Sequence, residues 1–134
     1  MRVVKVARAL VLISGALFGL IGVGYLVAPG FMLSIVGIPS APTVDFLMRT
    51  EGVALLTAGS LLFAAGNAGL AHVRFALLVL GGYYVLGSVV DLAAFGQGIV
   101  GLAAVPSAIV RVLVGGICLL AAARARDEAV VERA

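Results

Sequence analysis

Charged residues, tryptophan and cysteine are scarce in this chain. Its 134 residues include no tryptophan and one cysteine, and only 11% are charged, against roughly 25% in an ordinary soluble domain. A single cysteine, Cys118, excludes an internal disulfide and any metal site that needs several cysteines. Apolar residues make up 63% of the chain, whereas a soluble globule of this size buries only about two-thirds of its surface. The composition therefore favours a protein that has lipid as its solvent.

Four apolar stretches are long enough to cross a bilayer. A hydrocarbon core about 30 Å thick requires about 20 apolar residues in a helix. The sequence predicts such helices at residues 6–28, 44–66, 73–95 and 102–123. The second and third connections are short, so consecutive helices are expected to be antiparallel neighbours. We therefore expect one all-α domain over residues 1–134: an integral membrane antiparallel four-helix bundle with a tail at 124–134.

The basic residues predict the orientation of this bundle. Most of them belong to the N-terminus, the turn after the second helix and the tail: Arg2, Lys5, Arg8, Arg74, Arg124, Arg126 and Arg133. The opposite connections, residues 29–43 and 96–101, contain no Lys or Arg. The positive-inside rule therefore predicts that both termini are cytoplasmic. The cations form no basic stripe interleaved with aromatic residues, so nucleic acid is not an expected partner.

The first outer connection, residues 29–43, contains the apolar segment FMLSIVGI between Pro29 and Pro39. This segment is too short to span a bilayer and too apolar to be fully solvated, so we expect it at the membrane interface. It would be either a lid over an outward-facing cavity or a hydrophobic linker resting on lipid headgroups.

Small residues predict where the helices touch. Gly15, Gly19 and Gly22 form a stripe on the first helix, and Gly52 and Gly59 share a face of the second. Helices in lipid associate through close backbone packing, which such stripes permit. We expect an internal contact, with a homodimer face as the alternative.

Ionisable residues inside the predicted spans are the candidate site. On the predicted topology, Asp91 and Arg111 lie in the outer half at depths that differ by about 6 Å, which a long arginine side chain can cover. Asp45 and Arg49 are spaced for an i, i+4 pair, whereas Glu51 points to nearly the opposite face from Arg49. Tyr84 and Ser88 share the helix face of Asp91 and can form hydrogen bonds there. The candidate residues are therefore Asp45, Arg49, Glu51, Tyr84, Ser88, Asp91 and Arg111.

Charges at this depth indicate either of two arrangements, a polar pocket or a structural ion-pair network. The sequence contains no nucleotide-binding loop and no GxSxG elbow, and the single histidine, His72, falls in a cytoplasmic turn. We therefore predict no catalytic residue, cofactor or metal ligand.

Three segments resemble the DoxX-like small bacterial membrane proteins. They are YLVAPGFML at the end of the first helix, the GIP turn, and FLMRTEGVALLTAG, which contains Arg49 and Gly52. The resemblance implies a four-helix fold and a multi-pass location in the bacterial cytoplasmic (inner) membrane. It implies no established reaction.

These patterns favour a non-enzymatic membrane protein. It would be an accessory subunit of a larger membrane complex, or a binder of a lipid or small amphiphile through the outer polar cluster. Its expected partners are membrane lipids, together with a larger complex or further copies of itself. One alternative is a small dimeric transporter, although the first-helix carboxylate of known four-helix efflux proteins has no counterpart. Another is a lipid-modifying enzyme that uses Asp91 or Glu51 as acid and base.

Overall fold

The computed structural model describes residues 2–35, 37–102 and 104–131, and their secondary structure is helical. The helices are α1 (Arg2–Val27), α2 (Pro29–Ile35), α3 (Pro42–Asn67), α4 (Leu70–Gly96) and α5 (Ala104–Val131). The four long ones, α1, α3, α4 and α5, are long and apolar enough to cross a membrane. The four predicted spans are therefore confirmed as helices. α5 continues beyond residue 123 to Val131, so much of the predicted tail is helical, while residues 132–134 lie outside the described residues.

Local sequence explains several of the helix ends. Pro42 occupies the first turn of α3, where its fixed φ suits a helix and its missing N–H is not needed. Gly37 and Gly98 follow α2 and α4 with φ of 75° and 70°, a backbone conformation that other residues rarely adopt. Glycine therefore permits the chain to turn sharply after both helices.

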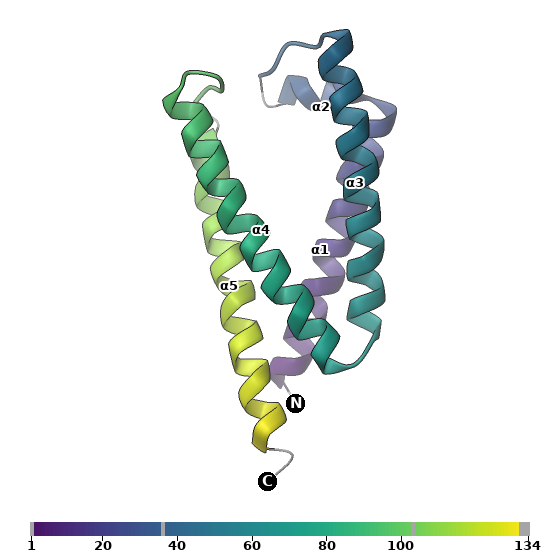
Figure 1. Ribbon diagram of the computed structural model, residues 1–134, viewed down its shortest axis with the longest axis vertical. Coiled ribbons are helices and arrows are strands. Elements are labelled where there is room, and N and C mark those ends of the chain that lie inside the picture. Colours follow the sequence, from purple (N-terminus) through teal and green to yellow (C-terminus); the bar gives the residue numbers. More distant parts are fainter. Residues whose placement is uncertain (1, 36, 103, 132–134) are drawn as a thin grey trace.

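The long helices pack as two pairs (Figure 1). α1 lies along α3, and α4 lies along α5, whereas contacts between the two pairs are much fewer. The pairs converge near the two chain termini and diverge toward α2 and the α4–α5 connection, which gives the molecule a V shape. The expected bundle is thus open at one end.

Glycines bring α1 and α3 into backbone contact. A Cβ atom on Gly22 would lie 2.8 Å from the Gly52 carbonyl oxygen, and one on Gly59 would lie 2.8 Å from the Gly15 carbonyl oxygen. Neither position has room for a side chain. The predicted internal use of the glycine stripe is confirmed, because these residues face each other across the α1–α3 contact.

The hydrophobic core lies where the two pairs meet. Phe18 of α1 and Leu62 of α3 pack into one buried cluster with Leu77 and Leu80 of α4 and with Cys118 of α5. The outer faces of the long helices carry many exposed large apolar side chains, and only 22–28% of the residues in their apolar segments are buried. Such a surface is suited to lipid rather than to water.

The apolar connection between α1 and α3 contains the seven-residue helix α2. Within α2, Leu33 is buried, whereas Phe31 and Ile35 are exposed. α2 contacts α1 and α3 at the open end of the V. These contacts are compatible with both a lid and an interfacial linker.

Candidate functional site

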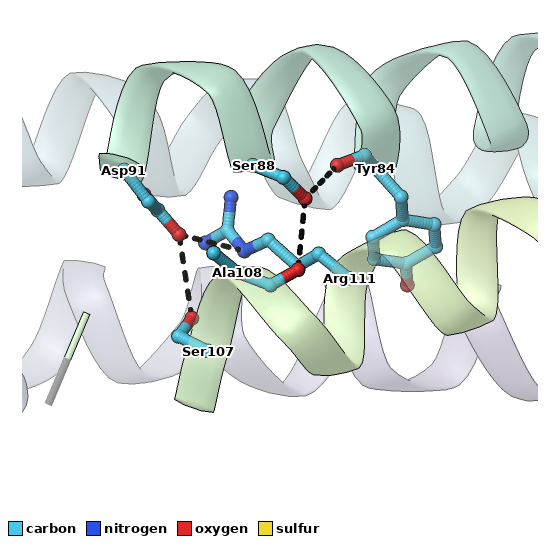
Figure 2. A network of polar contacts seen from close by, with 6 residues as sticks. All are labelled: Tyr84, Ser88, Asp91, Ser107, Ala108 and Arg111. Atoms are coloured by element: carbon cyan, nitrogen blue, oxygen red, sulfur yellow. Dashed lines mark hydrogen bonds and ion pairs between the residues drawn. The ribbon is translucent and has the colours of Figure 1, made fainter. Parts of the chain in front are cut away.

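Asp91 and Arg111 form an ion pair between α4 and α5 (Figure 2). The Arg111 Nε atom lies 3.4 Å from Asp91 Oδ2, and the Ser107 hydroxyl donates to the same oxygen at 3.4 Å. Gly87 leaves the space that the guanidinium occupies, because a Cβ atom there would lie 2.6 Å from Arg111 Nη1. The two residues meet as their predicted depths indicated, and their charges compensate each other.

Ser88 makes a second link between the same helices. Its side chain is buried, and its hydroxyl lies 2.8 Å from the Tyr84 carbonyl oxygen and 3.1 Å from the Ala108 carbonyl oxygen. The Ser88 hydroxyl is thus within hydrogen-bond distance of one backbone acceptor on α4 and one on α5. Ser88 therefore holds the helices together and does not present its hydroxyl to an open cavity.

Asp45 and Arg49 lie elsewhere, near the start of α3. The Ser40 hydroxyl donates to both carboxylate oxygens of Asp45, at 2.8 and 3.0 Å. Among the described residues, Asp45 and Arg49 form no ion pair within 4.0 Å, so the predicted i, i+4 pair is not seen. Instead, the connection before α3 brings the Ser40 hydroxyl to the carboxylate. Asp45 and the exposed Arg49 line a separate, open cavity of about 530 Å³.

Glu51 lies in a different setting, an apolar groove of about 450 Å³ that we call the α3–α4 groove. Residues from α1, α3 and α4 line it, and those used below are Phe18, Glu51, Ala54, Ala58, Ala65, Phe75, Val79 and Tyr83. Glu51 and Tyr83 are the lining residues nearest the start of α3 and the end of α4. α3 and α4 run in opposite directions from the short turn that joins them, so both residues belong to the end of the groove nearer the open end of the V.

Aromatic side chains connect this end of the groove to the α4–α5 network. The Tyr83 ring packs edge-to-face on Phe18 with 5.2 Å between ring centroids, and on Tyr84 with 5.6 Å. Tyr83 is also near enough to Glu51 and Arg111 for Coulombic interaction with both. The two polar regions are therefore neighbours, with Tyr83 between them.

The structure thus divides the seven candidate residues into three groups. Ser88, Asp91 and Arg111 come together between α4 and α5, where Tyr84 contributes its carbonyl oxygen. Asp45 and Arg49 line the cavity near the start of α3, and Glu51 lies alone in the groove. The sequence patterns did not predict the groove itself. A usable signal was present in Ala54, Ala58 and Ala65, small residues on the Glu51 face of α3.

Within the described ranges, no three or more His, Cys, Asp or Glu side chains gather as a metal site would require. Comparisons with protein-family models, curated proteins and solved structures find no match for the chain. The DoxX-like resemblance therefore stays a prediction, and the chemistry of the site has to be inferred from its own geometry.

Proposed function

We propose that this chain is a multi-pass protein of the bacterial cytoplasmic membrane, of the DoxX-like kind, that binds an amphiphile. An alkyl chain would lie in the α3–α4 groove, with its polar end beside Glu51 and Tyr83. The observation that carries the proposal is an apolar groove with a single charged lining residue, Glu51, toward one end. Both termini would be cytoplasmic, which places the open end of the V toward the outer leaflet.

The surface of the long helices supports insertion in a membrane. Leu20, Leu61, Leu86 and Leu113, one on each long helix, are 61–71% exposed. In water this surface would have to be covered by other molecules, whereas lipid tails solvate it directly.

The dimensions of the groove suit one alkyl chain. Glu51 and Ala65 are separated by 14 helical steps of 1.5 Å, so the groove follows α3 for about 21 Å. Its volume of about 450 Å³ falls within the 300–1,000 Å³ that is typical of small-molecule sites. Ala54, Ala58 and Ala65 leave the depression on α3, opposite the larger Phe75 and Val79 of α4.

The surroundings of Asp91 and Glu51 favour binding over acid–base catalysis. Asp91, the first candidate for a catalytic acid, is engaged by Arg111 and by the Ser107 hydroxyl. Glu51 is accessible, but among the described residues it has no hydrogen-bonded or ion-paired partner that could relay a proton. Its neighbours in the groove are apolar apart from Tyr83.

A photolabelling experiment tests the proposal. The protein in phosphatidylcholine nanodiscs is irradiated with a long-chain alcohol that carries a diazirine, with and without excess unlabelled alcohol, and labelled peptides are identified by mass spectrometry. We expect a saturable fraction of the label on the groove segments of α3 and α4. General lipid exposure gives only label that the excess alcohol does not displace.

Two matched variants show whether the groove is responsible. Ala58→Phe places a large ring in the groove and is expected to abolish the saturable label. Val53→Phe places the same ring on the same helix at a residue that is 55% exposed and not part of the lining, and should leave the label unchanged. Saturable labelling that survives Ala58→Phe would rule out the groove as the binding site.

A further inference from the structure

We infer that the amphiphile in the α3–α4 groove carries a cationic headgroup, an ammonium that pairs with the Glu51 carboxylate. This inference rests on the proposed function and adds the charge and chemical class of the ligand. It follows from the Glu51 carboxylate, which is unpaired among the described residues, and from the aromatic rings of Phe18 and Tyr83 at the same end of the groove.

Glu51 differs from the two other acids of the predicted spans in having no partner. Asp45 accepts from Ser40, and Asp91 is held by Arg111 and Ser107. For Glu51, no hydrogen bond or ion pair is found in the part of the chain that the structure describes. A carboxylate without a partner is costly at membrane depth, and a bound cation would offset that cost.

The nearby arginines do not supply this cation. Arg49 is two residues from Glu51, hence about 200° around the helix, and lines the other cavity. Arg111 is close enough to act electrostatically on Tyr83, but its Nε atom lies 3.4 Å from Asp91 Oδ2, so Arg111 already has a carboxylate partner. Among the residues that line the groove, the charged one is therefore Glu51, and neither arginine is paired with it.

Aromatic rings provide the second element of an ammonium site. Phe18 and Tyr83 line the groove with Glu51, and their rings meet edge-to-face at 63°. The faces of such rings attract alkylammonium groups through their quadrupoles, and this attraction is larger where water is excluded. A carboxylate and aromatic rings at the end of an alkyl-sized groove suit a long-chain amine.

A second copy of the chain is a poorer occupant by the same reasoning. A two-fold symmetric contact through this face would bring the Glu51 carboxylates of both copies into the same interface. Two unpaired acids would then share one apolar interface, which is unfavourable. A cationic amphiphile brings the complementary charge and an alkyl chain together.

The test compares three competitors that share one chain length and differ in headgroup: hexadecyltrimethylammonium, hexadecanol and hexadecyl sulfate. Each displaces the photoreactive alcohol from wild-type protein in nanodiscs, and empty nanodiscs provide the correction for partitioning into lipid. We expect the ammonium to displace the probe at about one-tenth of the concentration that the alcohol requires, and the sulfate to be weaker than the alcohol.

Variants then assign the preference to Glu51. Glu51→Gln keeps the size of the side chain and should bring the ammonium and alcohol within about twofold of each other, while the alcohol still binds. Asp45→Asn removes an acid of the same helix that lies outside the groove and should keep the wild-type preference. Tyr83→Leu is a second test of the same end of the groove. It should reduce the preference for the ammonium over the alcohol and leave alcohol binding unchanged.

The outcomes separate the inference from the function on which it rests. Equal displacement by the ammonium and the alcohol, or tighter binding of the sulfate, overturns the cationic headgroup and leaves the amphiphile proposal intact. Absence of saturable binding for all three compounds overturns both. A dimer that Ala58→Phe converts to a monomer, with no amphiphile bound, assigns the groove to a second copy and overturns both as well. The wild-type comparison decides the matter even if Glu51→Gln fails to fold.

Discussion

Gly22 and Gly19 offer a matched test of how α1 and α3 are held together. The two glycines are three residues apart on the same helix, but only on Gly22 would a Cβ atom point at the α3 backbone. A Cβ atom on Gly22 would lie 2.8 Å from the Gly52 carbonyl oxygen and 2.9 Å from the Leu56 nitrogen, whereas one on Gly19 would meet nothing within 4 Å. Alanine at position 22 therefore has to push α1 and α3 apart, and alanine at position 19 does not.

The magnitude of this effect follows from comparing the two variants. Each substitution gains the same helix propensity, about 1 kcal/mol for Gly→Ala, so this contribution cancels between them. The remaining difference is the cost of overpacking against backbone that cannot turn away, typically about 1–3 kcal/mol. We expect Gly22→Ala to be less stable than Gly19→Ala by that amount.

The absence of natural tryptophan allows a clean assay. Phe63 lies at the α1–α3 contact, 3.2 Å from a Cβ atom built on Gly15, so Phe63→Trp supplies a single fluorescent reporter there. Equilibrium unfolding of both variants in this background, by titration with SDS in mixed micelles, gives the difference in free energy of unfolding. Equal stabilities would refute the proposed backbone contact. A change of oligomeric state with Gly22→Ala would instead indicate that the glycine stripe joins two copies.

Three further predictions concern the α4–α5 ion pair, the closed end of the V and the orientation. Asp91→Asn should lower the free energy of unfolding by about 1–3 kcal/mol because Arg111 loses its counter-charge. Adding Arg111→Met to this variant should recover more than half of the lost stability. If the two substitutions instead lower the stability additively, the residues do not act as a pair. Arg8 donates to a carbonyl oxygen just after α3 at 3.2 Å, so Arg8→Met should cost about 0.5–1.5 kcal/mol in the same titration, and no loss would show that this bond contributes nothing. Ser40→Cys in a Cys118→Ala background should react with an impermeant maleimide in intact cells, and labelling only after permeabilisation would indicate the reverse orientation.

The polar residues show how far spacing alone could predict the candidate site. Asp91 and Arg111 were expected to meet because helix rise fixes their depths, and depth is a property of position along the chain. Asp45 and Arg49 also had favourable spacing, yet Ser40 from the preceding connection takes the carboxylate. Helical spacing shows which side chains can reach each other. It does not show which competing partner the rest of the chain brings within reach.

Glu51 also shows that helical spacing predicts the direction of a side chain but not its surroundings. Its placement away from Arg49 followed from 100° per residue, and the structure puts the two residues at different cavities. That Glu51 faces a groove depends on Phe18 of α1 and Tyr83 of α4, both far from it in sequence. Only the crossing of these helices brings the three residues together.

The sequence by itself determined the four long apolar helices and the glycines through which α1 and α3 meet, since both depend on composition and spacing along single helices. The tertiary structure decided that α1 pairs with α3 and α4 with α5, that the pairs diverge, and that a groove remains beside Glu51. The physical reason is that in lipid the core-facing and lipid-facing sides of a helix are both apolar. Hydrophobic periodicity then carries little information about which side faces inward, and side-chain packing between helices makes that choice.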